Sequence, residues 1–101
     1  MLGDLGEMMK LASRAKEIKS GMEKFRSDLP KLEFSASGEG VKVTVSGDFS
    51  VRSIEITSAA DPERLSREVT LAVNSALMAA KMTIQERMRE ITGGIDMPGL
   101  F

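Results

Sequence analysis

The sequence of 101 residues contains no cysteine, histidine, tryptophan or tyrosine. The lack of Cys excludes disulfides and thiolate metal sites, and the lack of His removes the commonest general base and metal ligand. Asp, Glu, Lys and Ser remain available for catalysis, but no recognisable motif pairs them. We therefore expect no enzymatic activity, no small-molecule substrate, and no metal or other cofactor.

Long apolar runs are also missing. No run approaches the ~20 residues that a membrane-spanning helix needs, and the first residues lack the basic-then-apolar pattern of a signal peptide. We expect a cytoplasmic protein with no membrane partner. The net charge is −1, from 14 basic and 15 acidic residues. This balance gives no overall sign of nucleic-acid binding, for which a basic patch or a high pI is expected.

An apolar heptad marks the first predicted helix, over residues 4–27, with Asp4 as N-cap and Glu7 completing a capping box. Pro30 blocks its continuation and leaves Leu29 outside the helix. The alternating steps of three and four residues suit a helix that lies along a nearly parallel helix. The heptad consists of Met8, Leu11, Ala15, Ile18, Met22, Phe25 and Leu29.

Three short strands follow, with apolar and polar residues in alternation and with Gly at the breaks between them. They cover residues 32–37, 41–46 and 53–57. Because each strand has one apolar face, we expect an antiparallel sheet that is covered on one side only. Broken alternation predicts a bulge between Phe49 and Val51.

A second long helix is predicted from Pro62 to about Thr92, between the N-cap Asp61 and the stop at Gly93-Gly94. Residues 1–92 then form one domain, and residues 93–101 a flexible C-terminal tail. The tail ends on Met97-Pro98-Gly99-Leu100-Phe101, which is unusually apolar and could dock onto a partner. One stripe of the helix suits the core: Leu65, Val69, Ala72, Val73, Ala76, Ala80 and Ile84.

Both helices are too long for the sheet. At 1.5 Å per residue they measure ~36 and ~44 Å, against ~20 Å for six-residue strands. Either the helices pair beyond the sheet or a second copy covers them, and two-fold dimers are the commonest closed oligomers. We expect a homodimer that uses a second apolar face of the second helix, although scattered exposed apolar residues are also common. That face carries Leu71, Met78 and Met82.

Two helical segments are locally basic. Residues 10–19 hold four cations against Glu17, a local charge of +3, and residues 81–89 hold three against Glu86, a local charge of +2. Such runs are either ordinary solvated helix faces or contacts for phosphate. The cations are Lys10, Arg14, Lys16, Lys19, Lys81, Arg87 and Arg89.

The order and spacing of several segments resemble the YbaB/EbfC family of bacterial nucleoid-associated proteins. The segments are residues 5–10, 32–34, 40–47, 54–56, 72–76 and 97–101. The resemblance implies an α+β protomer with a long helix, a three-stranded antiparallel sheet and a long helix. It also implies a tweezer-like homodimer that binds duplex DNA and organises the nucleoid or modulates gene expression. The Gly-rich N-terminal extension of many members is reduced here to Gly3 and Gly6.

Given this resemblance, we expect the seven cations near the helix tips to contact phosphates, with little readout of bases. No recognition-helix turn or zinc finger is present, and the lack of Trp and Tyr gives little support for stacking on single strands. The alternative is a protein–protein scaffold with incidental DNA contact. The net charge of −1 favours the scaffold. The local basic segments and the resemblance favour DNA.

Overall fold

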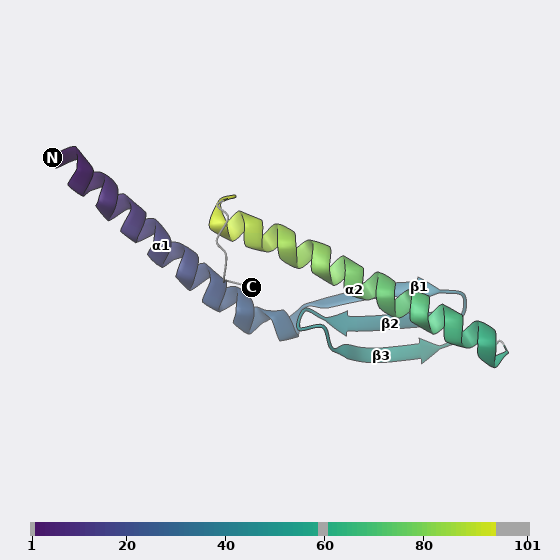
Figure 1. The fold of residues 1–101 in the computed structure, drawn as a ribbon. Coiled ribbons are helices and arrows are strands. Elements are labelled where there is room, and N and C mark those ends of the chain that lie inside the picture. Colours follow the sequence, from purple (N-terminus) through teal and green to yellow (C-terminus); the bar gives the residue numbers. More distant parts are fainter. Residues whose placement is uncertain (1, 59–60, 95–101) are drawn as a thin grey trace.

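The computed structural model describes residues 2–58 and 61–94. The chain is elongated, with extents of 73 × 19 × 17 Å. Figure 1 shows α2 lying across the sheet and continuing alongside α1, which projects away from it. This order confirms the predicted α+β protomer. The elements are α1 (Leu2–Asp28), a 3-10 turn (Leu29–Lys31), β1 (Glu33–Gly38), β2 (Val41–Ser46), β3 (Val51–Ile56) and α2 (Pro62–Thr92).

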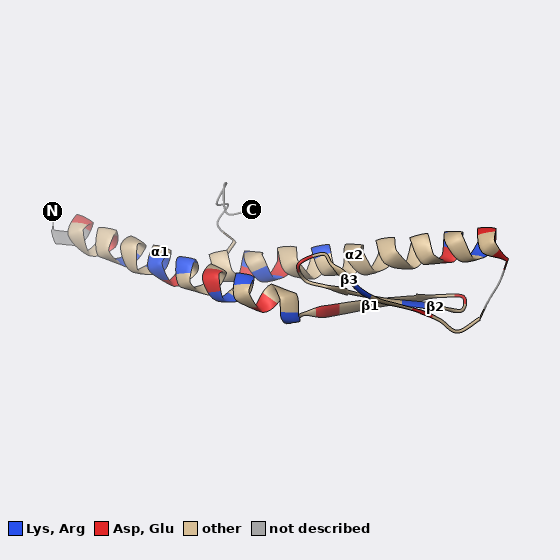
Figure 2. Ribbon diagram, turned by 90° about the horizontal axis from the view of Figure 1, so that it is seen from below, with Lys and Arg blue, Asp and Glu red and all other residues tan. Residues whose placement is uncertain are grey.

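The sheet has the order β1-β2-β3 and is antiparallel throughout. In Figure 2, α2 lies on one side of the sheet and the opposite side stays open, as the alternation predicts. The helix packs on β1 and β2. The apolar face of central β2 is therefore buried, whereas every residue of β3 is exposed.

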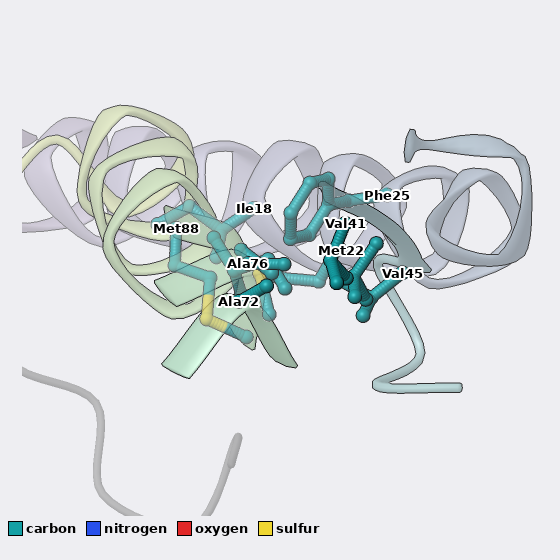
Figure 3. Packing of buried hydrophobic residues seen from close by; sticks show 11 residues of the cluster. Ile18, Met22, Phe25, Val41, Val45, Ala72, Ala76 and Met88 are labelled. Atoms are coloured by element: carbon teal, nitrogen blue, oxygen red, sulfur yellow. The ribbon is translucent and has the colours of Figure 1, made fainter. Parts of the chain in front are cut away.

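The core runs from the sheet along α2 to α1. Small side chains, among them Ala72 and Ala76, let α2 approach the sheet closely. Farther along α2, larger residues such as Met88 belong to the same cluster as the α1 residues (Figure 3). The buried apolar residues are Ile18, Met22, Phe25, Val41, Val43, Val45, Ala72, Ala76, Ala80, Ile84 and Met88.

The N-terminal cap predicted for α1 is wrong. The helix begins at Leu2, so Asp4 lies inside its first turn and cannot cap it or form a capping box with Glu7. An acidic residue in the first turn still suits the positive end of the helix dipole. The C-terminal prediction is confirmed, because Leu29 lies in the 3-10 turn outside α1.

Both ends predicted for α2 are confirmed. The Asp61 carboxylate accepts a hydrogen bond of 3.0 Å from the N–H of Arg64, which is the geometry of an N-cap. Gly93 has a φ of 65° and ends the helix in the left-handed conformation, which Gly adopts without a steric penalty. The predicted tail beyond Gly94 lies outside the described residues.

The strand boundaries differ slightly from the prediction. β3 begins at Val51, two residues before the predicted start. A bulge explains the broken alternation: Thr44 pairs with Ser53 but Val45 pairs with Val51, which leaves Arg52 as the extra residue. The bulge therefore falls one position after the predicted range, because the strand pairing and not the local pattern decides which residue is skipped.

Gly47 supports the junction between α1 and the sheet. It is buried, and its N–H donates to the Leu32 carbonyl at 3.0 Å. A Cβ at this position would lie 2.5 Å from the Leu29 carbonyl oxygen, so backbone would have to move. We expect Gly47→Ala to lower the free energy of unfolding by about 1–3 kcal/mol, measured by urea denaturation.

The control for this substitution is Gly6→Ala. A Cβ at Gly6 would meet nothing within 4 Å. Ala is the better helix former by ~1 kcal/mol, so this variant should be as stable as the parent chain or more stable. If the Gly47 and Gly6 variants were equally stable, the backbone near Leu29 would accommodate the added Cβ without a loss of stability, which would contradict this prediction.

Candidate nucleic-acid interface and dimer surface

The seven predicted cationic residues lie on α1 and α2, and all of them are exposed. Arg14 and Lys10 line a groove of about 410 Å³ between α1 and the C-terminal end of α2. Glu17 and Glu90 line the same groove and lower its positive potential. The groove therefore combines cations and anions and is not a uniformly basic pocket.

Arg14 lies beside the end of α2. A Cβ added to Gly93 would collide with its guanidinium group, which shows how closely the two approach. The last carbonyls of a helix carry the negative end of its dipole, so a cation at this position is favourable. Arg14 thus contributes to the packing of α1 on α2 as well as to the surface charge.

The α1 cations do not form one stripe. At ~100° per residue, Arg14 and Lys16 point ~160° apart around the helix axis. Lys10 lies on the side of Arg14, whereas Lys19 lies nearer to Lys16 (Figure 2 shows these basic positions distributed along α1). The basic segment therefore presents two pairs of cations on different sides of one projecting helix.

Lys81 is placed apart from the other cations. It lines a shallow hollow of about 440 Å³ with Phe49, Asn74, Leu77 and Met78. It lies ~18 Å along α2 from Gly93, at 1.5 Å per residue. Arg87 and Arg89, in contrast, belong to the last turns of α2.

The predicted dimer face on α2 is uncovered in the single chain. Leu71, Met78 and Met82 are all more than half exposed. Their steps of seven and four residues continue a heptad pattern, which suits contact with another helix. Met78 also lines the hollow beside Phe49, so this face adjoins the turn between β2 and β3.

A second uncovered apolar surface lies on β3, and the sequence reasoning did not assign it to the interface. Ile54 pairs with Val43, and Ile56 with Val41. Directly paired residues lie on the same side of a sheet, so both isoleucines share the side of the buried valines, yet α2 does not cover them. Ile54 is 45% exposed. The strand register thus shows that Ile54 and Ile56 lie on the core side of the sheet while they remain exposed, and the sequence pattern alone does not show this exposure.

Phe49 projects from the turn before β3. Its φ of 62° is rare for a bulky residue and occurs here in a tight turn, and its side chain is exposed. The turn is held by Ser46, whose buried hydroxyl donates to the Asp48 carboxylate. That hydrogen bond lowers the pKa of Asp48, helped by hydrogen bonds from Ser50 and by Arg52, 3.9 Å away.

Residues 3–95 match the family model of the YbaB/EbfC DNA-binding family. The chain belongs to the YbaB/EbfC DNA-binding family. It is 34% identical to a nucleoid-associated protein of Cyanothece sp., over 98% of this chain and 91% of the relative. It is 35% identical to a nucleoid-associated protein of Clostridium kluyveri, over 98% of this chain and 92% of the relative. A nucleoid-associated protein of Thermosynechococcus vestitus is 34% identical, over 98% of this chain and 90% of the relative.

Membership of the YbaB/EbfC family confirms the resemblance drawn from the sequence segments. Within residues 2–58 and 61–94, neither helix is long and apolar enough to cross a membrane. The same part of the chain contains no group of three or more acidic residues arranged to hold a metal ion.

Proposed function

We propose that this member of a DNA-binding family binds duplex DNA as a homodimer, through phosphate contacts and with little sequence preference. It would act at the nucleoid, in the cytoplasm, without catalytic turnover, and would influence nucleoid organisation and gene expression. The observation that carries the proposal is a set of exposed cations on a projecting helix of a chain that belongs to the YbaB/EbfC DNA-binding family. Phosphate contacts supply affinity but carry little sequence information.

The two uncovered apolar surfaces support the dimer. Ile54 of β3 and Met78 of α2 are both exposed, and Met78 shares a hollow with Phe49 of the turn that leads into β3. Large exposed apolar surfaces mark interaction sites, and a two-fold axis lets one such surface cover the same surface of a second copy. Pairing at β3 would also remove an exposed sheet edge. Phe49 is the aromatic side chain placed to fill a pocket of the partner.

The arrangement of the α1 cations supports contact with phosphates. The helix projects beyond the sheet, so a dimer would present two such helices. Cations on two sides of each helix can meet phosphates on both sides of it, whereas a flat basic face would meet only one row. Nearby acids, including Glu17 and Glu90, weaken the attraction. We therefore propose affinities in the range of non-specific binding, about 10⁻⁴–10⁻⁶ M at physiological salt.

The test is a salt titration of DNA binding by the whole protein. Two duplexes of equal length and unrelated sequence should bind with affinities within a few-fold of each other. The logarithm of affinity should fall linearly with the logarithm of salt concentration, by ~0.9 for each phosphate contacted. A strong preference for one duplex would contradict phosphate-dominated binding.

The alternative is a protein–protein scaffold in which the apolar surfaces recruit a different protein. The net charge of −1 favours it. The same titration separates the two functions, because absence of duplex binding even at ~50 mM salt, where phosphate contacts are strong, would favour the scaffold.

A further inference from the structure

A third apolar surface remains at the free end of α1. Leu11 of the heptad is 68% exposed, although Ile18, two steps farther along the same seam, is only 6% exposed. The change occurs where α2 ends, because Gly93 lies beside Arg14. The seam is therefore open from that point outward, and we call it the open seam. It carries Met8 and Leu11, flanked by Leu5.

The chain leaves α2 at the base of the open seam. Gly93 and Gly94 both have positive φ, and their N–H groups donate to the carbonyls of Glu90 and Arg89. Residues 95–101 follow directly. Seven extended residues span up to ~23 Å, whereas Met8 lies only ~9 Å along the helix from Arg14. These residues can thus reach the whole open seam of their own chain.

The composition of residues 95–101 matches this surface. Ile95, Met97, Leu100 and Phe101 are apolar, and Asp96 carries the segment's side-chain charge. Asp96 is two residues from Gly94, close to the groove that Arg14 and Lys10 line. A carboxylate beside these cations and apolar side chains on the seam complement both parts of the surface.

We propose that residues 95–101 dock along the open seam of α1 in the same chain, with Asp96 beside Arg14 and Lys10. Tethering favours this occupant over a second copy of α1, because a short linker raises the local concentration of the segment to the millimolar range. Docking itself does not depend on DNA. Its consequence rests on the proposed function: the docked segment competes with phosphates for Arg14 and Lys10 and weakens DNA binding.

Because the chain has no Cys, introduced pairs of cysteines report the docking without background. In Leu11→Cys/Leu100→Cys, mild oxidation at low micromolar concentration should form an intrachain disulfide at a rate independent of protein concentration. The matched control is Met9→Cys/Leu100→Cys, since residue 9 points ~160° away from residue 11. We expect the control to react at least tenfold more slowly.

Equal rates in the two variants would overturn docking on the seam. A predominant cross-linked product of two chains would overturn docking in the same chain and assign the seam to another copy. A rate of disulfide formation that falls when the protein is diluted would also overturn docking in the same chain. Selective and concentration-independent formation of the intrachain disulfide supports the proposal, whatever the protein does with DNA.

The consequence for DNA is measured on the same Leu11→Cys/Leu100→Cys protein, oxidised and then reduced. The oxidised form should bind duplex DNA at least threefold more weakly. Its slope of log affinity against log salt should be flatter by up to ~1.8 for each protomer in contact with the DNA, the equivalent of two phosphate contacts. Equal DNA affinity of the oxidised and reduced forms would overturn the competition between the segment and phosphates. The rates of disulfide formation would still decide whether the segment docks. Absence of DNA binding in the parent protein would overturn the proposed function and the competition that rests on it.

Discussion

Ile54→Glu should convert the protein from a dimer to a monomer, halving the mass in sedimentation equilibrium from twice the 11.0 kDa of the chain. In a single chain this side chain is 45% exposed and faces the side of the buried valines, so Glu there can remain hydrated in a monomer. In the proposed dimer it would be buried without a partner. Burial of an unpaired carboxylate costs several kcal/mol, and each 1.4 kcal/mol is a tenfold loss of affinity.

The matched control is Ser53→Glu, one residue earlier in β3. Ser53 pairs with Thr44, on the opposite side of the sheet, which α2 leaves open. The control adds the same charge to the same strand and should stay dimeric. A dimer that survives Ile54→Glu at low micromolar concentration would exclude β3 from the interface. If the unsubstituted protein sedimented as a monomer, the proposed dimer would be refuted.

Replacement of Lys10, Arg14, Lys16 and Lys19 by Ala should weaken binding about equally to unrelated duplexes. Each lost phosphate contact should flatten the slope of log affinity against log salt by ~0.9, so the loss of all four gives up to ~3.6 for each protomer in contact with the DNA. Because the cations form two pairs on different sides of α1, each pair replaced alone should give about half of this change. The measurement is a salt titration for each variant.

The matched control replaces Lys31, in the 3-10 turn, and Lys42, in β2, which are both exposed. It should leave the slope unchanged. Surface substitutions usually change the free energy of unfolding by no more than ~0.5 kcal/mol. Arg14 also packs beside the end of α2, so its loss should cost more than the loss of each lysine, but the α1 variants should stay folded. Loss of affinity for one duplex only would indicate base readout. Unchanged affinity in these variants and in one lacking Lys81, Arg87 and Arg89 would exclude the helices as the DNA surface.

Local chemistry in the sequence determined the order and most ends of the elements. Asp61, Pro62 and Gly93 act on their own neighbours in the chain, because caps and left-handed turns need only a few adjacent residues. Alternation of apolar and polar residues in the strands, and the two stripes of α2, likewise follow from the fixed periods of strand and helix. The segments that resemble the YbaB/EbfC family were recognisable because they too are short stretches of adjacent residues. Asp4 failed as a cap because nothing local stopped the helix from beginning at Leu2.

The tertiary structure alone decided which parts of these patterns are covered. Leu11 and Ile18 belong to one heptad and look alike in the sequence, yet only Ile18 lies beside α2. Ile54 and Val43 follow the same strand alternation, but α2 covers β2 and not β3. Burial depends on where a distant element lies and where it ends, and no short-range pattern contains that information. For the same reason the sequence showed the basic segments, while the position of Arg14 beside Gly93 required the packed helices.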